Sequence, residues 1–330
     1  MPSSVDDPKV TVIIPVYNSA ATLARAARSV LLQTLRELEL LIVDDGSTDE
    51  SFAVASAIAA TEPCVRVFQM PGNAGKPTAM NHAISLARGR WIAVLDADDR
   101  YLPERLATLI EAGEASGADL VADNQRHVDP ATGALVHFAF NQPGDGRAVD
   151  LADFIAHSGI RGTFDFGILK PVVRADFIAR TGLAYHPEAR LAEDFYYLLE
   201  FFAAGGTGWL VHEPLYEWTM PFSRSARQWT ETGAGQWRYD YTTALAVNRH
   251  FCDVYKNRPE LLALLQRRER DYFMMMHYLN AQRALAQGNA VRALALVASH
   301  PSTWTLLVQR VIGRATRALR RAAVEPSGTA

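Results

Sequence analysis

Four short apolar runs mark the first hundred residues, and each is followed by polar residues and then by a segment with helical spacing. The runs are VTVIIP (10–15), LELLIV (38–43), VRVFQ (65–69) and WIAVL (91–95). Continuous β-branched runs of this length are typical of strands buried on both faces of a sheet. Strands that alternate with helices predict a doubly wound α/β sheet with helices on both faces.

The pattern changes after about residue 119. Residues 120–140 predict two strands joined by a turn, and EARLAEDFYYLLEFFAAGG predicts an amphipathic helix that ends at Gly205 and Gly206. Beyond about residue 225 only helical segments follow. We therefore expect an α/β domain over residues 1–222, with halves at about 8–112 and 113–222, and an α-helical C-terminal region over 223–330.

Composition supports a globular chain. Of its 330 residues, 49% are hydrophobic and 21% are charged, which is ample for a core. The net charge of -3 argues against a nucleic-acid partner. Cys64 and Cys252 are expected to be free thiols in a reducing compartment. The chain has no secretory signal pattern and no apolar run long enough to span a bilayer, so we expect a cytoplasmic protein.

Polar residues follow the apolar runs at the places where the strands are expected to end. Ligands of open α/β sheets bind beyond the carboxyl ends of the strands, so these residues outline a candidate site. They are Pro15, Tyr17 and Asn18 after the first run, Asp44 and Asp45 after the second, Asn73, Gly75 and Lys76 after the third, and Asp96, Ala97, Asp98 and Asp99 after the fourth.

The carboxylates after the fourth run repel each other unless a cation lies among them. Asp96, Asp98 and Asp99 fit a site for Mg²⁺ or Mn²⁺, which prefer oxygen ligands and leave positions for phosphate oxygens. The alternative is that Asp98 and Asp99 only favour the N-terminus of the helix expected from Pro103.

Several ordered motifs extend this pattern. The segments VIIPVYNSAATLARAARSVLLQT, ELLIVDDGSTDES and PGNAGKPTAMNHAISLARGRWIAVLDADDRYLPERL resemble glycosyltransferase family 2 on the GT-A fold. The resemblance is close over about residues 8–112 and weaker to about residue 220, and it is to bacterial exopolysaccharide and O-antigen glycosyltransferases. It implies a nucleotide-diphosphate sugar as donor, with UDP favoured, and a divalent metal.

The resemblance also implies roles for individual residues. The first half would bind the nucleotide sugar and the second half the acceptor. The matches are Pro15, Tyr17 and Asn18 for the nucleotide, Asp44 or Asp45 for the base or ribose, Asn73, Gly75, Lys76 and Asn81 for the donor pocket, and Asp96 and Asp98 for the metal, with Asp99 as an alternative ligand.

Inverting sugar transfer needs a base that takes the proton of the acceptor hydroxyl. Glu193 and Asp194 begin an amphipathic helix, and the resemblance points to the aspartate of such a pair. We assign the base to Asp194 and keep Glu193 as the alternative, while either residue could simply stabilise the helix N-terminus. Asp165 is a weaker candidate on the acceptor side.

Basic and hydroxyl residues follow the last expected strand. Arg224, Ser225 and Arg227 are candidates for contacts to the diphosphate, because guanidinium groups bind phosphate in a bidentate manner. A solvated loop explains them equally well. His212 could be a third metal ligand, although a packed histidine is the simpler interpretation.

The chain also departs from part of the family it resembles. Processive members carry transmembrane helices and a Gln-x-x-Arg-Trp motif, and this chain has neither, which predicts one sugar per encounter. Its C-terminal segment instead predicts an amphipathic helix with five arginines, which fits either an anionic membrane surface with a polyprenyl-diphosphate-linked acceptor or a packing role. The arginines are Arg310, Arg314, Arg317, Arg320 and Arg321.

Two other functions remain open on sequence grounds. A nucleotidyltransferase would need a glycine-rich basic loop after the first strand, and PVYNSAATL contains no glycine. A non-catalytic sugar-nucleotide binding protein would be expected to lack the metal or base carboxylates, which are all present here.

Overall fold

The computed structural model describes residues 8–141, 144–158, 166–220 and 241–299. The chain forms two compact units, Met1–Thr243 and Ala244–Ala330. The expected boundary at residue 222 lies outside the described residues.

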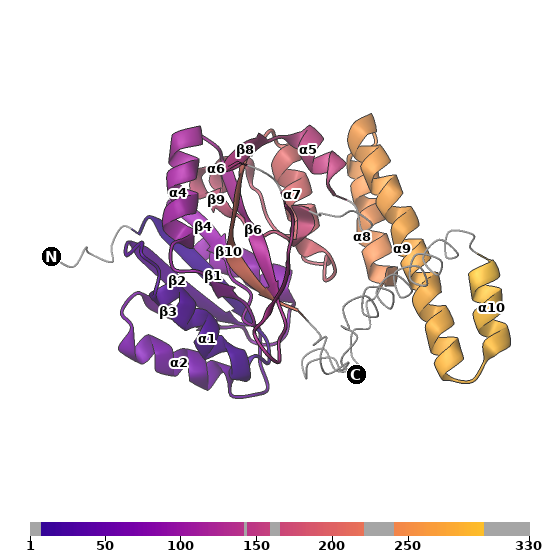
Figure 1. Cartoon of the computed structure of the whole chain (residues 1–330), viewed down its shortest axis with the longest axis horizontal. Coiled ribbons are helices and arrows are strands. Elements are labelled where there is room, and N and C mark those ends of the chain that lie inside the picture. Colours follow the sequence, from indigo (N-terminus) through magenta and orange to yellow (C-terminus); the bar gives the residue numbers. More distant parts are fainter. Residues whose placement is uncertain (1–7, 142–143, 159–165, 221–240, 300–330) are drawn as a thin grey trace, which may run out of the picture. The chain divides into compact units, whose positions relative to one another are not determined.

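One half of the sheet in the first unit is parallel, as the apolar runs predict. β1 pairs in parallel with β2 and β4, and β2 pairs in parallel with β3. The carboxyl ends of these strands therefore meet at one edge (Figure 1). The strands are β1 (Val10–Val16), β2 (Leu38–Asp44), β3 (Val65–Gln69) and β4 (Trp91–Val94).

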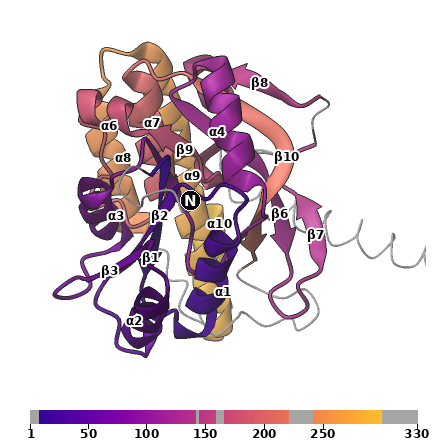
Figure 2. The same ribbon diagram turned by 90° about the vertical axis from the view of Figure 1, so that its left-hand side faces the viewer.

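The other half of the sheet is mixed. Among the described residues the strand order is β3-β2-β1-β4-β9-β6-β10-β5, where β9 is antiparallel to both β4 and β6 while β10 is parallel to β6. β7 and β8 pair with β6 and β10 (Figure 2). The bounds are β5 (Arg100–Tyr101), β6 (Leu120–Val128), β7 (Leu135–Phe138), β8 (Gly146–Val149), β9 (Val172–Arg174) and β10 (Gly208–Thr219).

Helices cover both faces of this sheet. The even-numbered residues of β1 share a buried cluster with α1, α2 and α4, whereas Ile92 and Val94 of β4 face a cavity shared with α3 and α7. Alternate strand residues therefore serve opposite layers. The helices are α1 (Ala20–Leu31), α2 (Ser51–Thr61), α3 (Lys76–Leu86), α4 (Arg105–Ser116), α5 (Leu151–Ala156), α6 (Ala175–Thr181) and α7 (Glu193–Ala203), with a 3₁₀ turn at Phe166–Ile168.

The described part of the second unit is helical, as expected. It contains most of α8 (Tyr241–Val254), together with α9 (Pro259–Ala286) and α10 (Ala290–Ala298). Asn289 caps α10 by accepting a hydrogen bond from the backbone N–H of Arg292 at 2.9 Å. Among the described residues, none of the helices is both long and apolar enough to cross a membrane. The arginine-rich segment after residue 300 lies outside the described residues.

Most local expectations are confirmed. The strands within residues 120–140 pair as the antiparallel β6 and β7, and both cysteines are free thiols. Helix α2 begins at Ser51, and no side chain caps it, that of Ser47 included. The Ser47 hydroxyl instead accepts a hydrogen bond from the backbone N–H of Asn18 at 2.9 Å.

Candidate active site

Five charged side chains meet at the carboxyl edge of the sheet. Lys76 Nζ lies 2.8 Å from Asp96 Oδ1, 3.1 Å from Glu193 Oε1 and 3.7 Å from Asp194 Oδ2. Lys170 Nζ lies 2.9 Å from Asp96 Oδ2 and also forms an ion pair with Asp194 Oδ2. The structure thus joins the expected metal motif to the expected base.

Burial and neighbouring charges shift the pKa values in this cluster in opposite directions. Burial alone would raise the pKa of Asp96, but the charges of Lys170 and Lys76 outweigh it and hold that pKa well below its usual range. Burial alone would lower the pKa of Lys76, and the charges of Asp194, Asp96 and Glu193 instead raise it well above its usual range. Asp96 and Lys76 therefore both carry their charges at neutral pH.

The beginning of α7 presents the two candidate bases. Ala192, just before the helix, has a left-handed backbone with φ 61°, which is uncommon for a residue with a side chain. Glu193 and Asp194 occupy the first turn, and no side chain caps the helix. Strained backbone of this kind is often found at functional sites.

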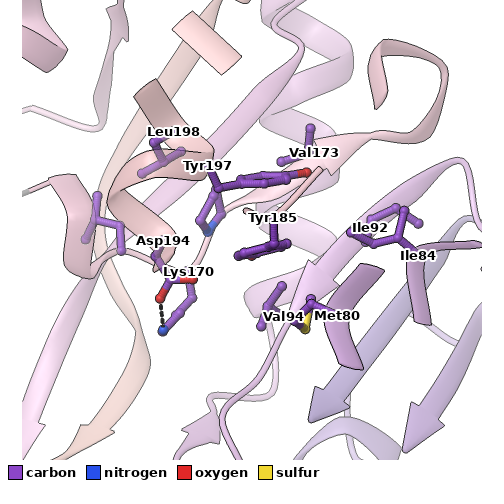
Figure 3. Close-up of a pocket in the computed structure, with 12 residues that line it drawn as sticks. Met80, Ile84, Ile92, Val94, Lys170, Val173, Tyr185, Asp194, Tyr197 and Leu198 are labelled. Carbon is purple, nitrogen blue, oxygen red and sulfur yellow. Dashed lines mark hydrogen bonds and ion pairs between the residues drawn. The ribbon is translucent and has the colours of Figure 1, made fainter. Parts of the chain in front are cut away.

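A small cavity of about 10 Å³ lies behind Asp194 and Lys170. Figure 3 shows both residues at one end of this otherwise mostly apolar space, with the ring of Tyr197 above that of Tyr185. The two rings stack with centroids 4.3 Å apart. A space of this volume holds about one water molecule and is too small for a larger ligand.

The carboxylates after β4 have different surroundings. Asp98 is exposed, and its backbone carbonyl accepts hydrogen bonds from Arg25 and the Thr219 hydroxyl, both at 2.6 Å. Asp99 is buried and accepts hydrogen bonds from the Tyr216 hydroxyl at 2.6 Å and the Thr219 backbone N–H at 2.7 Å. The Asp99 side chain thus ties this loop to β10. The intervening Ala97 is buried.

Metal ligation by three side chains has no support in the geometry. Among residues 8–299 that the structure describes, no group of three or more His, Cys, Asp or Glu side chains is placed to hold a metal ion. His212 Nδ1 lies 3.0 Å from the carbonyl oxygen of Gly144, and the His212 ring packs against Phe140. His212 lines a separate groove of about 1100 Å³ that does not include Asp96 or Asp98.

Asp44 and Asp45 also differ in their surroundings. Asp45 accepts hydrogen bonds from the backbone N–H groups of Ala74 and Gly75, both at 2.8 Å, and so shapes the loop before α3. Asp44 is fully buried and accepts from Ser47 and Gln69 through Oδ2, while Oδ1 has no partner among the described residues. Asp44 is therefore the one of the two with an oxygen to offer a ligand.

Asn18 and Gly75 fix the conformations of two neighbouring loops. Asn18 has φ 49°, and its side chain accepts a hydrogen bond from the backbone N–H of Thr48 at 2.8 Å. Gly75 has φ 93°, a conformation that side chains rarely allow. Tyr17 is 48% exposed beside Asn18, where it is open to a ligand. Pro15 is partly buried, and Asn73 is exposed.

The side chain of Asn81, which was expected in the donor pocket, is hydrogen-bonded to the protein backbone. Its Nδ2 donates to the carbonyl oxygen of Tyr185 at 2.7 Å, and its Oδ1 accepts from the Tyr185 backbone N–H at 2.8 Å. The side chain therefore links α3 to the segment that leads to α7.

Lys170 is the member of the site that the sequence did not suggest. It lies between the 3₁₀ turn and β9, and its side chain is 7% exposed. The only hint in the sequence is a lysine surrounded by apolar residues, in GILKPVV. The remaining candidates, Asp165, Arg224, Ser225 and Arg227, lie outside the described residues.

Comparison with known proteins gives one family. A model of "Glycosyl transferase family 2" matches residues 11–164. The succinoglycan biosynthesis protein ExoO of Rhizobium meliloti is 36% identical over 62% of this chain, and the match covers 59% of ExoO. The protein ExoU of the same organism is 29% identical over 97% of this chain and 90% of ExoU.

Two solved structures have the same fold. Residues 1–349 of S. aureus TarS in complex with UDP-GlcNAc align with a TM-score of 0.56 at 17% identity, over 89% of this chain and 92% of that one. The mannosyltransferase PcManGT of Pyrobaculum calidifontis, in complex with GDP-Man and Mn²⁺, aligns with a TM-score of 0.50 at 18% identity, over 92% and 80%. These likenesses place the α/β unit in the GT-A fold.

Proposed function

The chain belongs to glycosyltransferase family 2, and from that premise we propose that it transfers one sugar from a nucleotide-diphosphate sugar to a growing exopolysaccharide. The observation that carries this proposal is the joining of Asp96 and Asp194 through Lys170 at the carboxyl edge of the sheet. A donor bound at that edge would lie between the metal motif and the base. The succinoglycan biosynthesis relatives support the acceptor class.

The nucleotide would bind over the ends of β1 and β2. Asp44 offers an unpaired buried oxygen there, which suits the N–H group of a nucleobase or a ribose hydroxyl. Exposed Tyr17 offers a surface for the base, and Asn73 lies exposed in the loop that Asp45 shapes. We favour UDP, in line with the UDP-GlcNAc complex of the TarS structure.

A divalent cation fits the charge of the site. Among the described residues, carboxyl side chains outnumber amino side chains there, with Asp96, Asp98, Glu193 and Asp194 beside Lys76 and Lys170. Asp98 and Asp96 would hold Mn²⁺ or Mg²⁺, with phosphate oxygens and water completing its shell. When bound, the cation stabilises the charge that develops on the leaving diphosphate. Asp99 would keep its hydrogen bonds to Tyr216 and Thr219.

Transfer would proceed as a single inverting displacement. The acceptor oxygen attacks the anomeric carbon, the bond from that carbon to the diphosphate breaks, and Asp194 takes the proton of the acceptor hydroxyl. Glu193 remains the alternative base, and Lys76 lies near both carboxylates, 3.1 Å from Glu193 Oε1 and 3.7 Å from Asp194 Oδ2. An acceptor carried on a polyprenyl diphosphate would bring the chain to the inner face of the cell membrane.

The test combines a donor panel with a single variant. UDP-, GDP- and dTDP-sugars are offered with a glycan acceptor, with and without Mn²⁺. We expect Asp194→Asn to lower kcat by about 100- to 10,000-fold, the usual contribution of a general base, while the Kd of the donor stays within about twofold. The exposed Asp176 carries the matched control, Asp176→Asn.

Each alternative predicts a different result. Transfer retained by Asp194→Asn would move the base elsewhere. Release of pyrophosphate from a nucleoside triphosphate and a sugar phosphate would indicate a nucleotidyltransferase. Donor binding without transfer or hydrolysis by the wild type would indicate a binding protein.

A further inference from the structure

We propose that Lys170 is a positioning residue that fixes the orientation of the Asp194 carboxylate and links it to Asp96. The inference rests on the proposed role of Asp194 as the base. It adds a residue whose task is to set the distance between the base and the donor side of the site.

The geometry of the ammonium group carries the proposal. Lys170 Nζ is bound to Asp194 Oδ2 and lies 2.9 Å from Asp96 Oδ2, so it bridges a residue of α7 and the loop after β4. No described residue donates a hydrogen bond to Asp194 Oδ1. Because Oδ2 is occupied by the lysine, Oδ1 is left as the oxygen that can accept the proton of an acceptor hydroxyl.

The backbone of Lys170 is fixed from behind. Arg105 donates a hydrogen bond to the Lys170 carbonyl oxygen. Arg105 is itself fully buried, lies 2.7 Å from Asp123 Oδ1, and stacks over the ring of Tyr101 at 4.1 Å from its centroid. Pro171 follows directly and restricts Lys170 to extended backbone. The ammonium group is therefore delivered from a rigid part of the core.

Lys76 differs from Lys170 in a way that separates their tasks. The Lys76 side chain is 25% exposed and pairs with three carboxylates, whereas that of Lys170 is 7% exposed. Lys76 can turn toward a phosphate from the open side of the cluster. Lys170 lines the cavity of about 10 Å³ behind the carboxylates, which is too small to hold a substrate.

The experiment is a double-mutant cycle on the full chain, with Lys170→Met, Asp194→Asn and the double variant. We expect Lys170→Met to lower kcat by about 100-fold, the usual loss when a catalytic group is misplaced by about 1 Å. The Kd of the UDP-sugar should stay within about twofold of wild type. The double variant should be no slower than Asp194→Asn, because a residue that acts through Asp194 has nothing left to position.

Control variants distinguish a loss of Asp194 positioning from a loss of protein stability or of positive charge. Lys9→Met removes a partly exposed lysine that lies 3.8 Å from Glu37, and it should leave kcat unchanged. Lys170→Arg keeps a cation and should recover part of the lost kcat. If Lys170→Met melts below the assay temperature, Lys170→Gln takes its place in the same cycle.

Two results would overturn the proposal. A rise of tenfold or more in donor Kd with kcat retained would make Lys170 a phosphate contact. Losses of kcat that multiply in the double variant would mean that Lys170 and Asp194 act independently. Full activity of Asp194→Asn alone would instead refute the assignment of the base, whatever Lys170→Met does.

Discussion

The hydrogen bonds between Asn81 and Tyr185 can be tested directly. The family resemblance implies that Asn81 lines the donor pocket, whereas the structure gives it a role in stability. Asn81→Ala removes two hydrogen bonds, of 2.7 and 2.8 Å, between residues 104 positions apart. Tyr185 is 4% exposed, so its backbone N–H and carbonyl groups would lose their partners away from water. Each bond contributes about 1 kcal/mol and an unpaired buried group costs about 1–3 kcal/mol, which gives a loss of about 2–4 kcal/mol.

The loss should appear in thermal unfolding. For a unit of this size, 1 kcal/mol corresponds to about 2–4 °C, so Tm should fall by roughly 4–16 °C. The measurement is a thermal-shift or calorimetric scan, followed by titration of the UDP-sugar well below the new Tm. Donor Kd should stay within about twofold of wild type, because the Asn81 side chain is occupied by Tyr185.

Asn73 provides the matched control. It is an exposed asparagine in the same segment, and no hydrogen bond of its side chain to another described residue is present. Asn73→Ala should shift Tm by less than about 1 °C, as surface changes usually do. The reasoning is refuted if Asn81→Ala keeps its Tm and weakens donor binding tenfold or more.

Three further predictions concern the loops and β6. Asp98→Asn should abolish Mn²⁺-dependent donor binding with Tm unchanged, while Asp99→Asn should lower Tm by about 3–8 °C and keep that binding, as measured by calorimetric titration. Gly46→Ala should lower Tm by several degrees in a thermal scan, because Gly46 has φ +69° and a Cβ there would lie 2.6 Å from the backbone of Gly72. Burial, followed by the charge of His137, lowers the pKa of His127 to about 4. The unfolded state therefore binds more protons than the folded state between about pH 4 and 6.5, so the free energy of unfolding should fall as pH falls through that range. His127→Gln should flatten this part of the pH profile, as measured by urea unfolding. An unchanged pH profile would contradict the assignment to His127.

The edge of the sheet was predictable because it depends on local patterns. Buried strands and the residues that follow them are adjacent in sequence, so the positions of Asp44 and Asp96 follow from the strands before them. The start of α7 at Glu193 and Asp194 was predictable for the same reason.

The sequence did not predict which residue of each motif is hydrogen-bonded within the protein and which is open to a ligand. Asp98 and Asp99 are the same residue type in neighbouring positions, and only hydrogen bonds from Tyr216 and Thr219 distinguish them. Asn81 is likewise distinguished by Tyr185, which lies 104 positions away. Resemblance gives the motif, but the direction of each side chain depends on contacts that are distant in the chain.

Lys170 could not be predicted as a site residue, because its contacts come from distant segments of the chain. No motif marks it, and its role depends on a carbonyl bound by Arg105 and an ammonium group bound by Asp96 and Asp194. Three segments of the chain must be in place before these contacts exist. A single lysine in an apolar stretch carries no sign of this in the sequence.

The hydrogen bonds from Tyr216 and Thr219 to Asp99 also have a consequence for biosynthesis. The loop after β4 leaves the ribosome 117 to 120 residues before the partners that fix it. At about 5–20 residues per second, the nascent chain carries an unfixed acidic loop for roughly 6–24 s. β1 to β4 can pair during that interval, but the aspartate loop takes its final form only after β10 has been translated. Premature termination before residue 216 would leave a polypeptide that has the parallel half of the sheet and lacks a fixed acidic loop.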